Sequence, residues 1–150
     1  MPVSIDRLRL LAEFRYRLRL FLLFSEEAAL RSGLQPQQHQ LLLQIAGAPQ
    51  GTVVTVGYVA ERLGLRHNSV VELCNRCEES GLIARRQDAV DRRYVHLEVT
   101  RNGKEVLHAL SIDHARELNE LAPQLIQTLS KLDTAPDKQK RQRAGAYHEV

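Results

Sequence analysis

The stretch TVGYVAERLGLRHNSVVELCNRCEESGL, residues 55–82, decides the architecture of the chain. Thr55 is suited to cap a short helix, and Gly64 is suited to end it. A second helix is predicted over residues 68–80, after a linker of only a few residues. Two short helices joined by a tight turn that contains glycine form a helix-turn-helix motif.

A β-hairpin is predicted directly after this motif. Residues 82–87 form its first strand, and residues 92–99 form the second, in which apolar and polar side chains alternate. The polar residues 88–91 between them have the composition of a turn. A hairpin in this position is a wing, so the segment is predicted to be a winged helix-turn-helix.

Long helices are predicted on both sides of this lobe, over residues 4–31 and 101–132, with a short helix over 36–45 in between. The first long helix is apolar well beyond a single stripe, so it must be covered on more than one side, and a second copy of the chain is a natural cover. Pro123 is expected to kink or break the last helix. The polar tail, 133–150, is predicted to be flexible.

The composition agrees with one globular domain. The chain has 150 residues, of which 43% are hydrophobic and 26% charged. The expected fold class is mainly α with a small hairpin wing, in one domain over 1–150 whose winged lobe spans 35–99. The longest apolar run near the N-terminus, 20–24, is far too short to span a membrane, and no signal peptide is recognisable, so a cytoplasmic protein is expected.

The second helix of the motif has two distinct faces. At about 100° per residue, its apolar side chains lie on one side, and polar side chains such as Glu72 and Glu79 lie on the other. In helix-turn-helix proteins the polar face enters the major groove of DNA, where Asn pairs with adenine and Arg with guanine. The candidate DNA contacts on this helix are His67, Asn68, Ser69, Val71, Asn75 and Arg76. The alternative is an ordinary solvated surface, because the two glutamates repel phosphates.

Arginines flank the turn of the hairpin on both sides. Arg85 and Arg86 come before it, and Arg92 and Arg93 follow it, so four guanidinium groups are predicted to cluster near the tip. Arginine inserted into a narrow minor groove reads the shape of DNA. The alternative is a charged, exposed hairpin whose arginines pair with the aspartates of the turn, residues 88 and 91.

Three segments together resemble the winged helix-turn-helix of the MarR family of bacterial transcriptional regulators. They are TVGYVAERLGL (55–65), NSVVELCNRCEESGLIARR (68–86) and DAVDRRYVHLEVTRNG (88–103), and the likeness extends over residues 4 to about 132. The resemblance implies a homodimer whose long terminal helices interlock and whose two recognition helices bind a pseudo-palindromic operator. Its implied DNA-reading positions are Asn68, Ser69, Asn75 and Arg76, with Arg92 or Arg93 in the minor groove. At Val71 and Glu72, where the family often has hydroxyl-bearing and basic residues, the chain departs from the pattern, which leaves the base sequence open.

The resemblance also implies regulation by a ligand. Most members of the family are repressors, and many release DNA when a small aromatic or anionic effector enters the cleft between the long helices and the winged lobe. The residues that the resemblance suggests for this cleft are Leu11, Phe14, Arg15, Leu18, His39 and Leu43. The plainer alternative is that these residues belong only to the core and the dimer interface.

Other classes of function have little support in the sequence. No phosphate-binding loop or hydrolase motif is present, so an enzyme and a cofactor are not expected. The six histidines are dispersed, and the two cysteines, Cys74 and Cys77, have no partner pair for a zinc site, so no metal is expected. Two alternatives to a DNA-binding regulator stay open: a winged-helix module that binds protein, and a redox-sensing regulator that uses these cysteines, although helical spacing places both of them in the core.

Overall fold

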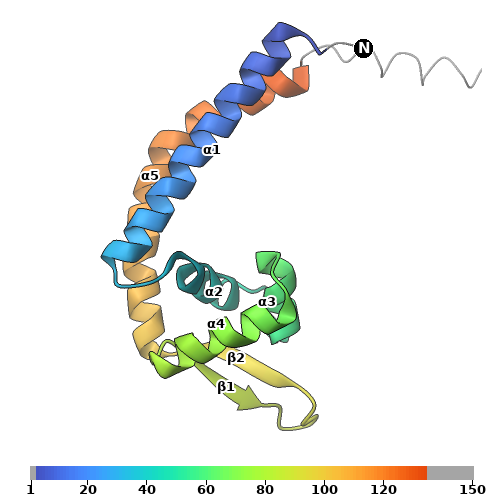
Figure 1. Cartoon of the computed structure of the whole chain (residues 1–150), viewed down its shortest axis with the longest axis vertical. Coiled ribbons are helices and arrows are strands. Elements are labelled where there is room, and N and C mark those ends of the chain that lie inside the picture. Colours follow the sequence, from blue (N-terminus) through green and yellow to red (C-terminus); the bar gives the residue numbers. More distant parts are fainter. Residues whose placement is uncertain (1–2, 135–150) are drawn as a thin grey trace, which may run out of the picture. The chain divides into compact units, whose positions relative to one another are not determined.

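The computed structural model describes residues 3–134. These residues form five helices and one β-hairpin. The elements are α1 Ile5–Arg31, α2 Pro36–Ala46, α3 Val56–Leu63, α4 His67–Glu79, β1 Ile83–Gln87, β2 Val95–Val99 and α5 Arg101–Thr134 (Figure 1). The predicted fold class, mainly α with a hairpin wing, is therefore confirmed. The chain divides into two compact units: the winged unit, Leu23–Arg116, and the helix-pair unit, which comprises residues 3–22 and 117–134 of the described chain.

Local signals position the helices of the winged unit. The Thr55 hydroxyl oxygen accepts a hydrogen bond from the Tyr58 amide at 3.2 Å and caps α3. Gly64 ends this helix with a φ of 65°, a left-handed conformation that glycine adopts without strain. The helices α2, α3 and α4 pack on one another, and the hairpin lies against them through contacts of α2 with β2 and of α4 with β1 (Figure 1). The core between them includes the fully buried residues Leu41, Leu42, Val59, Val70 and Leu73.

The hairpin pairs its strands antiparallel, with Ile83 opposite Val99 and Arg86 opposite His96. The second strand begins at Val95, so the prediction that it begins at Arg92 was wrong. The reason lies in the turn: the Tyr94 amide donates to the Asp91 carbonyl at 3.1 Å, which holds the residues between them out of the ladder.

The start of α5 is packed tightly against the start of the hairpin. The Thr100 hydroxyl donates to the Gly81 carbonyl at 2.6 Å and accepts from the Gly103 amide at 3.1 Å. A Cβ atom on Gly103 would lie 2.2 Å from the Leu82 carbonyl oxygen, so no larger residue fits there without displacing backbone. The glycine thus sets how closely helix and hairpin approach.

In the helix-pair unit, the first part of α1 and the last part of α5 lie side by side (Figure 1). Of the kink or break expected at Pro123, the break is not present: α5 continues through this residue to Thr134. A proline removes one backbone hydrogen bond, and the turns on either side hold the helix together. Asp133 and Thr134, assigned to the tail by prediction, extend the helix, and the rest of that tail lies outside the described residues.

Few side chains of the helix-pair unit are buried. Within residues 3–22 and 117–133, only Leu121 and Thr128 are buried. Many apolar side chains of this unit are instead exposed: Val3, Ile5, Leu8, Leu11, Tyr16, Leu20, Leu22, Leu118, Ile126 and Leu129. None of the helices within residues 3–134 combines the length and apolar character that a membrane span requires.

Candidate nucleic-acid interface

Helix α4 has the two faces that its sequence predicts. Its apolar side is fully buried and consists of Val70, Leu73, Cys74 and Cys77. The opposite side is open: Asn68, Ser69, Asn75 and Arg76 are exposed, and Val71 is half-buried. The first turn of α4, which includes His67, carries no acidic side chain, so nothing there offsets the positive end of the helix dipole.

Arg85 lies on the face of the hairpin that is turned toward α4. Its guanidinium group donates to Glu78 Oε1 at 3.1 Å and to Asn75 Oδ1 at 2.9 Å. The amide of Asn75 is thereby oriented, because its oxygen accepts from Arg85 and its nitrogen is directed away from that contact. Arg85 thus connects the wing to the exposed face of α4, a role that the sequence alone did not indicate.

The expected cluster of four guanidinium groups at the tip is not what the structure contains. Besides Arg85, Arg86 is also engaged along the strands, where its Nε lies 2.9 Å from Glu98 Oε2. Arg92 and Arg93 follow the turn and are both exposed. Within the described residues, the Arg92 side chain makes no ion pair. The backbone carbonyl of Arg92 accepts a hydrogen bond from Gln87 Nε2 at 3.0 Å.

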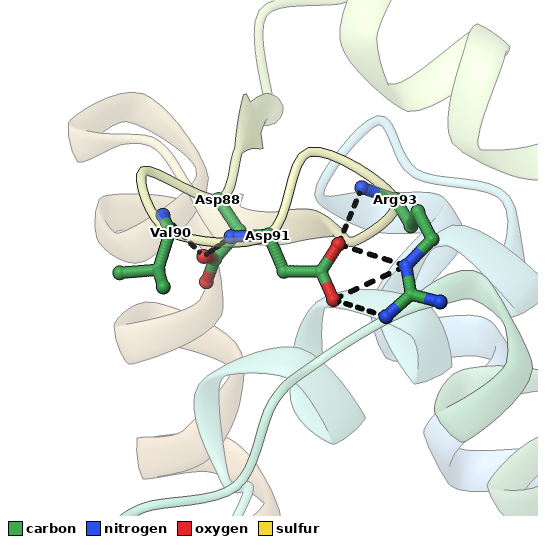
Figure 2. Close-up of polar contacts among 4 residues, drawn as sticks. All are labelled: Asp88, Val90, Asp91 and Arg93. Carbon is green, nitrogen blue, oxygen red and sulfur yellow. Dashed lines mark hydrogen bonds and ion pairs between the residues drawn. The ribbon is translucent and has the colours of Figure 1, made fainter.

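Two aspartates organise the tip of the wing (Figure 2). Asp88 Oδ1 accepts from the amides of Val90 and Asp91, both at 2.8 Å, and Asp88 Oδ2 lies 2.7 Å from His96 Nε2. The hydrogen bond from the Asp91 amide, with those from His96 and the Val90 amide, lowers the pKa of Asp88 to about 2. The carboxylate therefore stays charged, and its hydrogen bonds with the backbone amides stabilise the turn.

The second aspartate holds an arginine. Asp91 accepts from the Arg93 amide at 3.1 Å, from Arg93 Nε at 2.9 Å and from a terminal guanidinium nitrogen at 2.6 Å (Figure 2). This fork lowers the pKa of Asp91 and raises the pKa of Arg93. The alternative interpretation of the hairpin, in which its arginines pair with the aspartates of the turn, is therefore correct for Arg93. The side chain of Arg93 nevertheless remains 84% exposed.

The residues suggested for an effector cleft fall in both units. Leu11, Phe14, Arg15 and Leu18 belong to the part of α1 in the helix-pair unit, whereas His39 and Leu43 lie on α2 in the winged unit. Leu43 is exposed, and His39 is buried. His39 Nδ1 is also buried and has no hydrogen-bond partner among the described residues.

His39 is part of a polar contact that sequence reasoning missed. Its ring centroid lies 4.9 Å from that of His114, so two histidines that look dispersed in the sequence are neighbours in the fold. The Leu110 carbonyl accepts from His114 Nδ1 at 2.7 Å, and Ser25 Oγ lies 2.8 Å from His114 Nε2. Burial, and then His114, lower the pKa of His39. The sequence feature that indicates this contact is Ser25, a polar residue within the apolar stripe of α1.

The two cysteines are free and buried. Burial raises the pKa of both thiols, and together with Cys74 it brings that of Cys77 to about 11. A thiol in this environment is a poor nucleophile, which disfavours the redox-sensing alternative. In the part of the chain that the structure describes, no three His, Cys, Asp or Glu side chains are grouped so that they could hold a metal ion.

A helix-turn-helix whose second helix has an open polar face, followed by a hairpin, defines a winged-helix protein. Residues 32–93 match the model of the MarR family. AbsC, a MarR family transcriptional regulator from Streptomyces coelicolor, has a similar structure, with a TM-score of 0.70 and 17% identity over 97% of this chain and 99% of AbsC. The resemblance to the MarR family is therefore confirmed: the chain has the fold of these transcription regulators, and its central segment carries their sequence pattern.

Two further structures of this fold contain a bound molecule. A MepR variant from S. aureus, bound to an oligodeoxyribonucleotide, has a TM-score of 0.58 and 18% identity over 96% of this chain and 93% of MepR. CouR from Rhodococcus jostii, bound to p-coumaroyl-CoA, has a TM-score of 0.59 and 21% identity over 79% of this chain and 87% of CouR. A comparison with curated protein sequences finds no match.

Proposed function

We propose that the protein is a homodimeric transcription regulator that binds double-stranded DNA through α4 and the wing. The observation that carries this proposal is the contact between α4 and the wing. Arg85 of the hairpin is hydrogen-bonded to α4, and the tip of the same hairpin exposes Arg92 and Arg93. An open helix face suits the major groove, and exposed arginines beside it suit the phosphates or the minor groove. The MepR variant with bound oligodeoxyribonucleotide supports this reading.

In this proposal the contacts divide by role. Asn68, Ser69, Asn75 and Arg76 read base edges, with Val71 and His67 at the border of the same face. Arg92 and Arg93, together with Arg86, supply attraction to the backbone, while Arg85 acts by holding Asn75 in place. Glu72 is exposed on the same helix, and it accepts a hydrogen bond from a cytosine amino group if it faces the groove.

Dimer formation through the helix-pair unit is the second part of the proposal. Among its described residues, this unit exposes many apolar side chains and buries only two. Exposed apolar surface of this kind is typical of a protein–protein interface. A second copy would cover this surface and set two α4 helices one turn of DNA apart, which fits a pseudo-palindromic operator. The site of action is then the cytoplasm, where bacterial DNA lies.

Regulation by a small aromatic or anionic effector is the third part, with the protein acting as a repressor. CouR is bound to p-coumaroyl-CoA, which shows that a protein of this fold accepts an acyl thioester. The candidate residues remain Leu11, Phe14, Arg15, Leu18, His39 and Leu43. An effector there releases DNA only if it binds the DNA-free arrangement of the dimer more tightly than the bound one.

The proposal is tested with duplex DNA from upstream of the protein's own gene, titrated by fluorescence anisotropy at several salt concentrations. We expect affinity to fall steeply with salt, and Arg93→Ala to weaken binding and reduce the slope by about one. Arg116→Ala is the matched control, because Arg116 is also exposed and lies near an aspartate, Asp113, but on α5. Equal effects of both substitutions, or no binding to any duplex at low salt, contradict the proposal.

A protein-binding winged helix is the second candidate, and the exposed Glu72 and Glu79 on α4 favour it. The same titration separates the two functions. If the protein is a protein-binding module, both the wild type and Glu72→Gln have negligible affinity for duplex DNA. If it is a DNA-binding regulator, the substitution removes a carboxylate from the interface and changes the affinity for duplex DNA.

A further inference from the structure

The tip of the wing contains a carboxylate whose charge is not matched by an arginine. Arg86 pairs with Glu98 and Arg93 pairs with Asp91, whereas the side chain of Asp88 has His96 as its partner in the described chain. Asp88 stays ionised, because its pKa is lowered to about 2. Its charge is therefore balanced only when His96 carries a proton.

His96 also holds Asp88 mechanically. An ionised carboxylate only accepts hydrogen bonds, so His96 Nε2 must carry the hydrogen in the contact of 2.7 Å, whether the ring is neutral or protonated. With Oδ2 held by His96, Oδ1 is directed at the amides of Val90 and Asp91. Asp91 in turn holds Arg93. A continuous chain of hydrogen bonds thus runs from the second strand to the exposed guanidinium group.

The surroundings of His96 leave Asp88 as its main electrostatic partner. Arg86 lies opposite His96 in the strand register and is bound to Glu98, which is on the same face of β2. The helix that packs on β2, α2, contains no Asp, Glu, Lys or Arg, and its titratable residue, His39, is buried. The segment beside β2, whose Val54 carbonyl accepts from the Leu97 amide, is uncharged over residues 51–55.

We propose that His96 is a positioning residue of the DNA interface: it holds the wing-tip turn through Asp88 and, when protonated, neutralises the one wing carboxylate that no arginine within residues 3–134 pairs, so that the wing binds duplex DNA more tightly as the pH falls. This inference rests on the proposed function. Protonation adds one positive charge beside the surface that approaches the phosphates, and it turns the hydrogen bond into an ion pair.

Two variants separate the mechanical role from the charge. In His96→Gln the side-chain amide reaches about as far as Nε2 and still donates, but it does not titrate. In His96→Phe both the donor and the charge are lost, while the size of the ring is kept. His108→Gln is the matched control, because His108 is exposed on α5 and has no part in the interface.

The DNA readout is fluorescence anisotropy with an A·T-rich duplex of about three helical turns, at constant ionic strength. From about pH 8 to pH 6, the wild-type protein and the control variant gain about twofold to fivefold in affinity. His96→Gln binds as the wild type does at the higher pH but gains less than the wild type, because only the imidazole of His67 remains at the interface. His96→Phe binds about threefold to tenfold more weakly at the higher pH.

The second readout needs no DNA. In the free protein, the NMR signals of the Val90 and Asp91 amides and of Arg93 Nε–H report the hydrogen bonds of the turn. We expect His96→Gln to keep them in place and His96→Phe to move them toward the values of an unstructured loop, while the core signals of Leu41 and Leu73 stay unchanged.

The outcomes separate the two levels of the argument. If His96→Gln retains the full gain in affinity, the charge role is wrong, and if His96→Phe leaves the wing signals and the DNA affinity unchanged, the positioning role is wrong. If the wild-type protein binds no duplex at any pH, the proposed function fails, while the NMR comparison still decides whether His96 holds the wing.

Discussion

The two units of the chain differ in how they bury apolar surface. The winged unit encloses a continuous core that includes Leu41, Leu42, Leu73 and Ile83, all almost completely inaccessible. The helix-pair unit buries only two described residues and exposes ten large apolar ones. A unit with its own core has the free energy to fold alone, whereas two helices with apolar outer faces need another surface to cover them. The difference indicates that stability resides in the winged unit, and it supports the proposal that the helix pair serves assembly.

The largest expected effect tests this division of roles with one substitution in each unit. Leu42→Ala removes a fully buried side chain and is expected to lower the free energy of unfolding by about 2 to 5 kcal/mol at every protein concentration. Leu8→Ala, at a position that is 49% exposed, is expected to act through dimer formation, so its effect shrinks as the protein concentration rises. Urea unfolding over a range of concentrations measures both. A large, concentration-independent cost for Leu8→Ala would show that the helix pair has its own core.

Ile126→Glu tests assembly directly. Ile126 is 63% exposed on α5, and a carboxylate there would be desolvated when a second copy covers the helix. We expect the dimer to weaken by about 2 to 4 kcal/mol, with the winged unit still folded, as measured by sedimentation equilibrium and circular dichroism. Val53→Glu is the control, since Val53 is an exposed apolar residue of the winged unit. Equal loss of dimer in both variants would place the interface elsewhere.

Gly103→Ala tests the close approach of α5 to the hairpin. The added methyl group would meet the Leu82 carbonyl oxygen, so we expect a loss of about 1 to 3 kcal/mol in thermal or urea unfolding. Gly57→Ala is the matched control: its Cβ would be 3.7 Å from the nearest atom, and alanine favours a helix, so this variant is expected to be neutral or slightly more stable. The reverse order of stabilities would contradict the packing described for α5.

His39 provides the smallest expected effect, one that depends on pH. Burial and His114 hold the pKa of His39 below its ordinary value of 6.5, so the folded protein binds fewer protons there than the unfolded chain. The stabilisation is therefore complete above about pH 6.5 and is lost as the pH falls below it, by at most about 1.4 kcal/mol per pH unit. His39→Leu is expected to remove this slope, and His108→Leu, at an exposed position, to keep it. Urea unfolding between pH 7 and pH 5 provides the comparison, and identical slopes in all three proteins would exclude His39 as the cause.

Much of the fold was predictable because its signals are local. Thr55 and Gly64 bracket α3 through contacts within a few residues, and the spacing of apolar residues along α4 identifies its buried face. The hydroxyl oxygen of Thr100 likewise accepts from the amide of Gly103, three residues later, and caps α5. Each of these features depends on neighbours in the sequence or on helical periodicity.

The candidate site was predicted less completely. The exposed face of α4 and the two arginines after the turn follow from periodicity and position. The partner of Arg85, however, depends on the packing of the hairpin on α4, and the sequence placed this residue at the tip. The contact between His96 and Asp88 joins a strand to a turn and has no sequence motif of its own.

By itself, then, the sequence determined the order of the helices and strands and the side of α4 that faces the core, since capping and amphipathic spacing act over a few residues. The tertiary structure alone decided which polar groups meet: Arg85 with Asn75, His96 with Asp88, and His114 with Ser25, residues that are 89 positions apart. The physical reason is the short range of hydrogen bonds. A shift of about an ångström breaks such a contact, and only the packed core brings distant parts of the chain that close.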